Sequence, residues 1–109
     1  MKIITKAIIA FAAVLSGVGP ALAVNYEGKR PISVFTDGSR PCTFFRLEGV
    51  NQADPAQPGE WFAIPRSHPA YAENFAALLT AKVSKLLINV STNGTNQCGF
   101  AGVDNITLP

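Results

Sequence analysis

An apolar run near the N-terminus does most to limit what this chain can fold into. Lys2 and Lys6 form a short basic start, residues 7–19 are almost wholly apolar, and Pro20 precedes the small-residue pattern at 21–23. Together these features are typical of a secretory signal peptide. The run is too short to cross about 30 Å of hydrocarbon, which needs about 20 apolar residues. We therefore expect cleavage after Ala23 and no stable membrane insertion of the product.

Removal of residues 1–23 leaves residues 24–109 as a single domain, exported to the periplasm or the medium of a bacterium. So short a chain buries only a modest fraction of its surface. Its two cysteines are Cys42 and Cys98, and in an oxidising compartment such a pair most simply forms a disulfide. This disulfide would close a loop of more than fifty residues. In the chain-entropy model, closing a loop of that size stabilises the folded protein by on the order of 4 kcal/mol.

Export also changes the charge balance of the protein. The full chain has nine basic and seven acidic residues, and loss of Lys2 and Lys6 leaves seven of each. Binding to nucleic acid relies on several Lys and Arg side chains placed against phosphates. A neutral domain gives no support for such a partner, and we expect none.

Alternating hydrophobic residues predict several short strands. Residues 32–36 and 42–48 follow the two-residue period of a strand, and the turn formers of residues 37–41 separate them, which predicts a hairpin. Residues 49–60 hold two prolines and two glycines and predict a surface loop. A third short strand is expected at residues 61–64.

A helix is the clearest local prediction. Pro69 fits a first helical turn, with Ser67 or His68 as a cap. Apolar residues then recur at helical spacing, and we expect them on one face: Tyr71, Phe75, Leu78, Leu79 and Val83. A fourth strand at residues 86–92, a polar glycine-bearing loop at 93–102 and a final strand at 103–108 complete the chain.

The order strand, strand, strand, helix, strand, strand predicts a mainly β fold with one helix, arranged as a five-stranded OB-fold-like small barrel. A resemblance rests on the same residues. The runs Cys42-Thr43-Phe44-Phe45-Arg46-Leu47 and Trp61-Phe62-Ala63-Ile64, the helical segment 75–81, Cys98 and the closing segment 103–108 resemble a group of small secreted bacterial proteins. That group is similar in layout to the B subunits of subtilase-cytotoxin and pertussis-like toxins.

The resemblance covers residues 31–109 and implies a domain that binds glycans and forms pentamers, as those B subunits do. No sugar-binding residue of the toxins matches a position in this sequence. The group commonly has a glycine between the helix and the fourth strand, where this chain has Ser84-Lys85. We therefore expect this helix to end differently.

Enzymatic function finds little support in the sequence. His68 is the only imidazole, and its position before Pro69 suits a cap or an exposed loop better than a catalytic triad. The seven carboxylates are scattered along the chain. No Cys-x-x-Cys spacing accompanies the single histidine, so neither a metal site nor a redox pair is indicated. We expect no catalytic residues, no metal and no cofactor.

The aromatic residues raise the question of what covers the second face of the sheet. Phe44 beside Phe45, and Trp61 beside Phe62, must face opposite sides of their strands. One side can line the core. The other needs a cover, which could be the helix and a loop, a partner subunit of a homo-oligomer, or a sugar held on Trp61.

Two functions follow as expectations. The first is a non-enzymatic binding module, a toxin-B-subunit-like protein that recognises glycan and forms a ring, with Trp61 and Arg46 as contact residues. The second is a monomeric envelope protein that binds or inhibits another protein through loops 49–60 or 93–102. Because a fold does not determine function, the solution mass is the first discriminator between them.

Overall fold

The computed structural model describes residues 23–109, so the predicted signal peptide, residues 1–23, lies outside the described residues except for Ala23. Within this range the protein is mainly β with one helix, as the sequence predicted, and Cys42 is bonded to Cys98. The elements in chain order are β1 (Asn25–Lys29), β2 (Pro31–Thr36), β3 (Cys42–Leu47), β4 (Phe62–Pro65), α2 (Tyr71–Ser84), β5 (Ile88–Gln97) and β6 (Phe100–Thr107).

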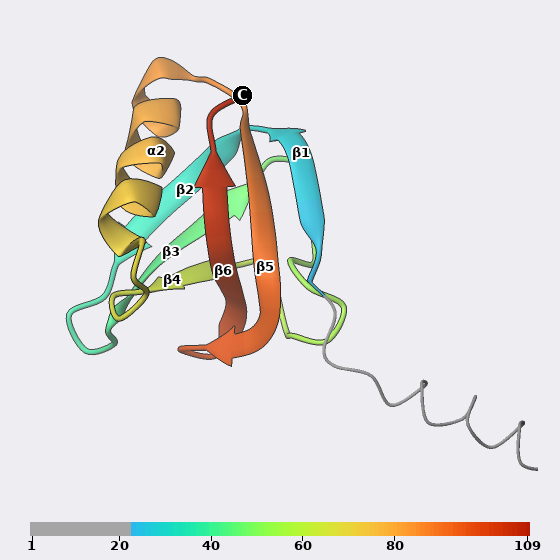
Figure 1. Ribbon diagram of the computed structural model, residues 1–109. Coiled ribbons are helices and arrows are strands. Elements are labelled where there is room, and N and C mark those ends of the chain that lie inside the picture. The colour runs from blue at the N-terminus through green and yellow to red at the C-terminus, as the bar shows by residue number, and fades with distance from the viewer. Residues whose placement is uncertain (1–22) are drawn as a thin grey trace, which may run out of the picture.

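The six strands of this range form one sheet in the order β1-β5-β6-β4-β3-β2. Strands β4 and β6 pair in parallel, and the other pairs are antiparallel. In Figure 1 the long β5–β6 hairpin lies in front, while β2, β3 and β4 cross behind it. From β2 onward, the chain follows the predicted order of strands and helix. Strand β1 is an addition that the sequence analysis did not anticipate.

The predicted small barrel is not closed, because the sheet is open and has six strands in the described residues instead of five. Its edges are β1, which pairs with β5, and β2, which pairs with β3. Yet these two edges are consecutive in the chain and only Arg30 separates them. The register shifts on both sides of Arg30, and Pro31 has no N–H to donate to a ladder. The chain therefore passes from one edge to the other without hydrogen bonds between the edges.

The core lies inside the curved sheet, with α2 packed against it. Phe45 and Phe62 stack at its centre with ring centroids 5.0 Å apart, and both are fully buried. The other buried members of this inner cluster are Leu47, Val50, Ala53, Ile64, Leu78, Ala81, Ile88, Val90, Ala101, Val103 and Ile106. Strand alternation predicted that one residue of Phe44-Phe45 and one of Trp61-Phe62 would point inward. In the structure these are Phe45 and Phe62.

The helix buries less of its apolar stripe than expected. Its buried residues are Asn74, Leu78 and Ala81, whereas Leu79 is 37% and Val83 80% exposed. Helix α2 packs on the sheet against β2, β4 and β6. Tyr71 of the predicted stripe packs, partly buried, against the inner cluster, so the shortfall lies at Leu79 and Val83.

Both ends of α2 differ from a standard capped helix. No side chain caps the first residue, and His68 instead accepts a hydrogen bond at Nδ1 from the N–H of Ala70, over 2.9 Å. At the other end Lys85 adopts a left-handed conformation, with φ 57° and ψ 41°. The N–H of Leu86 then bonds to the carbonyl of Ala81 over 2.9 Å, which closes the helix as a Schellman turn does. Lysine thus stands where glycine is usual.

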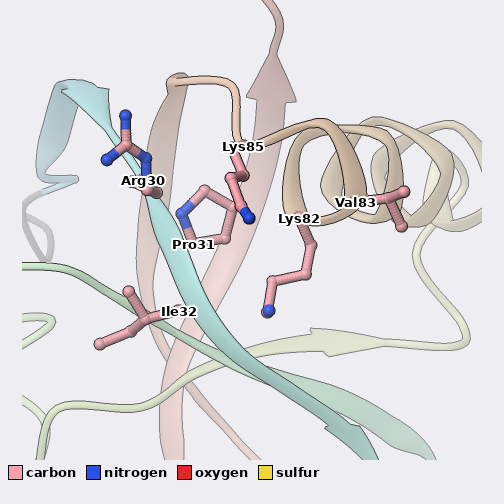
Figure 2. Close-up of a pocket in the computed structure, with 6 residues that line it drawn as sticks. All are labelled: Arg30, Pro31, Ile32, Lys82, Val83 and Lys85. Carbon is pink, nitrogen blue, oxygen red and sulfur yellow. The ribbon is translucent and has the colours of Figure 1, made fainter.

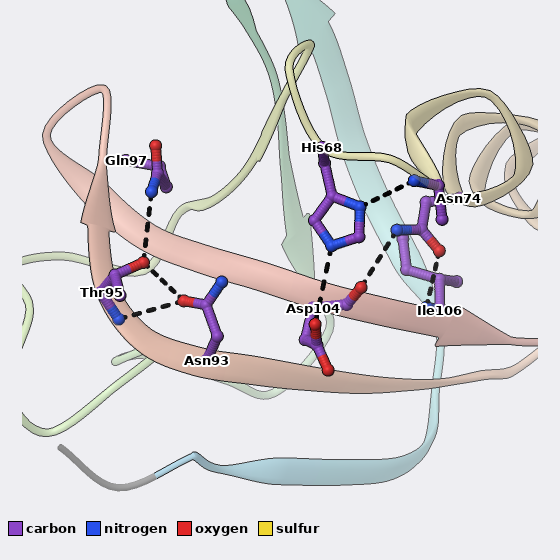
Figure 3. Close-up of polar contacts among 8 residues, drawn as sticks. His68, Asn74, Asn93, Thr95, Gln97, Asp104 and Ile106 are labelled. Atoms are coloured by element: carbon purple, nitrogen blue, oxygen red, sulfur yellow. Dashed lines mark hydrogen bonds and ion pairs between the residues drawn. The ribbon is translucent and has the colours of Figure 1, made fainter. Parts of the chain in front are cut away.

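The predicted loop at residues 93–102 is wrong, because this stretch forms most of a hairpin. Cys98 and Gly99 make a two-residue turn with φ 52° and 95°, the positive values that a type I′ turn requires. Before the turn, residues 93–95 of β5 bulge opposite Gly102 of β6. Figure 3 shows the side chains of Asn93, Thr95 and Gln97 bonded to one another there. Because these polar side chains hydrogen-bond to one another in a bulge, the segment has the composition of a loop although it belongs to a strand.

Candidate functional site

Four aromatic rings gather on the outer face of the sheet, and we call them the outer aromatic cluster: Phe35, Phe44, Trp61 and Phe100. Phe44 is fully buried at their centre. Phe35 stacks on it with centroids 4.9 Å apart, and Phe100 meets it edge-on at 5.7 Å. Trp61 in turn meets Phe35 edge-on at 5.1 Å. The second aromatic face is therefore covered largely by the protein itself.

The helix takes no part in this cover, contrary to one of the expectations. Phe44 packs with Cys42, Ala63, Trp61, Cys98 and Phe100, whereas the buried apolar residues of α2 all belong to the inner cluster. The tip of the β5–β6 hairpin supplies Cys98 and Phe100. The disulfide thus holds the hairpin tip over the outer face, and Phe35, 40% exposed, stays open to solvent at its margin.

Arg40 closes one side of the cluster. Its Cζ lies 4.5 Å from the centroid of Phe44, a cation–π distance. Its Nε donates to Oδ2 of Asp37 over 2.9 Å, and its Nη1 donates to the carbonyl of Cys98 over 3.3 Å. The N–H and hydroxyl of Ser39, followed by Arg40, lower the pKa of Asp37 to about 2. The carboxylate therefore fixes Arg40 above the ring at all but strongly acid pH.

The opposite side brings together the two residues that the sequence analysis selected. Arg46 of β3 places its Cζ 5.6 Å from the centroid of Trp61, which directly precedes β4. The Nε of Arg46 lies 3.6 Å from Oε2 of Glu60. Trp61 is half-buried, and the side chains of Arg46 and Glu60 are 32% and 39% exposed. An indole ring, a guanidinium and a carboxylate thus share one rim, which we call the Trp61 rim.

The guanidinium of Arg46 is only partly satisfied. Its Nε is buried and has no hydrogen-bond partner in the described part of the chain. Glu60, at 3.6 Å, is close enough for charge pairing but too far for a hydrogen bond. The Trp61 rim therefore holds polar groups whose hydrogen-bonding capacity is not used by the domain itself.

A second concave surface lies between β2 and α2, and we call it the basic groove. Figure 2 shows its lining: Arg30, Pro31, Ile32, Lys82, Val83 and Lys85. Its volume is about 360 Å³. Arg30 pairs only loosely with Glu48, at 3.8 Å. Three cations around an apolar floor suit a ligand with a negative charge beside an apolar group.

The described residues offer no constellation that resembles a catalytic site. His68 is bonded at Nδ1 to a backbone N–H, and its Nε2 lies 3.6 Å from Oδ1 of Asp104 (Figure 3). No hydroxyl or thiol nucleophile lies within hydrogen-bond distance of it in residues 23–109. The same range contains no group of three or more His, Cys, Asp or Glu side chains able to hold a metal ion.

Sequence reasoning missed Phe35, Arg40, Glu60 and Phe100, although one signal for Phe100 was present. Side chains two apart in a strand share a face, so Cys42 of β3 lies beside Phe44, and Phe100 follows Cys98 directly after the two-residue turn. A disulfide between the two cysteines therefore brings the two phenylalanines together. Arg40 and Glu60 lie outside regular elements, and no periodicity could have placed them.

Comparison with known proteins does not extend these observations. No protein-family model matches the chain, and no curated protein is significantly similar to it in sequence. Within residues 23–109 the helix is neither long nor apolar enough to span a bilayer.

Proposed function

We propose that this protein is an exported, non-enzymatic binding module that recognises carbohydrate at the Trp61 rim. The observation that carries the proposal is the Arg46 guanidinium, whose Cζ lies 5.6 Å from the ring centroid of a half-buried Trp61, with Glu60 3.6 Å from the Nε of Arg46. An indole face suits the apolar C–H face of a sugar. The guanidinium and the carboxylate supply donors and acceptors for its hydroxyl groups.

Export supports this function, because a secreted domain meets glycans on cell surfaces and in the envelope. The signal-peptide pattern of residues 1–23 and the Cys42–Cys98 disulfide are what such a compartment requires. The resemblance to toxin B subunits points in the same direction and suggests a ring of several copies, in which one weak site per subunit gains strength through multivalency.

A glycan array probed with the oxidised domain, residues 24–109, tests the proposal. We expect binding to a restricted set of glycans, a loss of at least tenfold in Trp61→Ala and Arg46→Ala, and partial retention in Trp61→Phe. Arg66→Ala serves as the matched control, because Arg66 is an exposed arginine in the turn after β4. Equal binding by all five proteins, or none by the native domain, would overturn the proposal.

The basic groove favours a second candidate, a monomeric envelope protein that binds or inhibits another protein. Val83 is 80% exposed at its margin, and Leu86 and Leu87 are each 44% exposed nearby in sequence. Apolar side chains ringed by cations are a common form of protein-binding surface. Light scattering of the oxidised domain over a concentration series discriminates the two. A closed ring supports the B-subunit-like reading, and a monomer at every concentration supports the envelope protein.

A further inference from the structure

Asp54, in the loop between β3 and β4, is a buried carboxylate without a positive partner in the described residues. It is 1% exposed. Its Oδ1 accepts a hydrogen bond from the N–H of Ala56 over 2.8 Å, and no ion pair of residues 23–109 includes it. Burial of a carboxylate without a counter-ion is costly. A cation in contact with Asp54 would therefore stabilise the domain.

The backbone N of Val24 lies one hydroxyl group away from Asp54. The N–H of Val24 donates to Oγ1 of Thr92 over 3.0 Å, and that hydroxyl donates to Oδ2 of Asp54 at a long 3.4 Å. The N–H of Thr92 in turn donates to the carbonyl of Val24 over 2.9 Å. Thr92 is itself 1% exposed. Val24 is thus hydrogen-bonded to Thr92 through both its N–H and its carbonyl, and the Thr92 hydroxyl links it to the carboxylate of Asp54.

Val24 and Asp54 also line the same cavity. It has a volume of about 510 Å³ and is lined by Ala23, Val24, Asn25, Asp54, Pro55 and Ala56. The charge of Asp54 also acts on Tyr26. The pKa of Tyr26 is raised, mainly by burial and secondly by the negative charge of Asp54. There is consequently room beside Val24 for a larger and charged nitrogen group.

We propose that hydrolysis of the Ala23–Val24 peptide bond creates the counter-ion of Asp54, so that processing of the precursor completes a buried ion pair. The inference rests on the export part of the proposed function, but not on carbohydrate binding. A signal-peptidase-type endopeptidase adds water across the bond. The hydroxyl joins the carbonyl carbon of Ala23, one hydrogen joins the nitrogen of Val24, and the proton of the new carboxyl group passes to that amine.

The difference between the two states lies in the number of donors. In the uncleaved chain the nitrogen of Val24 has one hydrogen, which Thr92 accepts. The ammonium has three and carries a full positive charge, so it can keep that bond while its charge faces Asp54 across the Thr92 hydroxyl. Retention of one more residue moves the charge by about 3.5 Å and leaves an amide at Val24. The pair therefore requires cleavage at this one bond.

Four chains test this inference by equilibrium unfolding. One pair begins at Val24 and the other at Ala23, each with Asp54 or with Asp54→Asn, and all are released from a fusion protein by a protease. All the described strands, helix α2 and the disulfide lie within residues 24–109, so the chains keep the whole described core. We expect the unfolding equilibrium constant to be about tenfold smaller for the Val24 chain than for the Ala23 chain, and equal for the two Asp54→Asn chains. No difference, or the same difference in both backgrounds, would overturn the proposal.

A titration of the α-amino group by NMR gives a second readout that needs no Asp54 variant. An unperturbed α-amino group titrates near pH 8. We expect the group to titrate above this value in the Val24 chain and near it in the Ala23 chain; equal values would contradict the pair. Export of the full precursor from a bacterial host, followed by mass spectrometry, tests the cleavage, and an N-terminus other than Val24 would contradict it. None of these measurements involves a sugar, so failure here and failure of glycan binding are distinguishable.

Discussion

The side-chain amide of Asn74 on α2 is hydrogen-bonded to the backbone on both sides of Asn105 in β6. Its Oδ1 accepts from the N–H of Ile106 over 3.1 Å, and its Nδ2 donates to the carbonyl of Asp104 over 3.3 Å (Figure 3). Asn74 is 3% exposed. The Asn74 amide thus bonds α2 to β6 through one donor and one acceptor, as the backbone of a neighbouring strand would.

Replacement of Asn74 by alanine should destabilise the domain by about 2–3 kcal/mol. The change leaves a buried N–H of Ile106 and a part-buried carbonyl of Asp104 without partners, and a buried unpaired group carries a desolvation penalty of about 1–3 kcal/mol. Denaturant unfolding measures the loss, with Glu73→Ala as the exposed control on the same helix. A loss below about 0.5 kcal/mol in Asn74→Ala would show that water replaces the amide.

Gly102 should tolerate no side chain. A Cβ there would lie 2.8 Å from Cγ of Gln97 and from Oγ1 of Thr95, and 2.9 Å from Oδ1 of Asn93. We expect Gly102→Ala to cost about 1–3 kcal/mol, because the bulge must move. Gly38→Ala is the matched control, since a Cβ at Gly38 meets nothing within 4 Å. Equal unfolding midpoints for the two variants would mean that the three polar side chains simply rotate away.

Lys85→Gly should stabilise the domain. Lys85 ends α2 in the left-handed region with φ 57°, where a Cβ is strained by about 1 kcal/mol and glycine is not. Lys82→Gly, one turn earlier within the helix, should instead destabilise by about 1 kcal/mol. Thermal unfolding of the two variants measures both the expected gain and the expected loss of stability. A loss of stability in Lys85→Gly would indicate that the lysine side chain contributes contacts that outweigh its backbone strain.

The turn that holds Arg40 should weaken in acid. Since the pKa of Asp37 is lowered from 3.8 to about 2, its stabilising effect is complete above pH 3.8 and disappears as the pH falls through 2. Carbon-13 NMR titration of the carboxyl group should give a midpoint near 2. Ser39→Ala should raise that midpoint only in part, because the backbone N–H of Ser39 still donates to Asp37. A midpoint near 3.8 in the native protein would contradict the hydrogen-bonded turn.

Loss of the disulfide should be the most damaging of these changes. Cys42 and Cys98 are 56 residues apart in sequence, for which the chain-entropy model gives about 4 kcal/mol. Cys42→Ala with Cys98→Ala should reduce the free energy of unfolding by up to that amount, and it should also expose Phe44 to solvent. Intrinsic fluorescence of Trp61 reports the second effect independently. An unchanged unfolding midpoint would show that the hairpin tip stays in place through its apolar contacts alone.

Much of the fold could be predicted from local patterns. Alternation marked β2 and β3, and the turn formers at 37–41 marked the hairpin between them. The β5–β6 hairpin escaped detection because Asn93, Thr95 and Gln97 satisfy one another in a bulge. The helix face was overestimated for a different reason, since periodicity gives the direction of Val83 but not how far the sheet extends beneath it.

The candidate site was only partly readable from sequence. Trp61 and Arg46 could be selected by residue type and by their position in neighbouring strands. Their contact depends on the pairing of β3 with β4, which sets Phe45 opposite Phe62 and so places Arg46 next to Trp61. Glu60 completes the group from a loop, and its position depends on tertiary packing that local pattern does not encode. The sheet likewise stays open because its edges β1 and β2, on either side of Arg30, do not pair, and side-chain periodicity does not encode this.

The position of the Cys42–Cys98 disulfide also sets how the protein would respond to a pulling force. Tension applied to the two chain ends passes through the disulfide, so the 56-residue span that it closes cannot be drawn out while the bond is intact. That span would otherwise add roughly 190 Å of contour length, at about 3.4 Å per residue. It contains β3, β4, α2 and all of β5. Under load, the described part of the oxidised protein can lengthen only outside this span, where β1, β2 and β6 lie, and the greater part of the domain stays short until the bond is reduced.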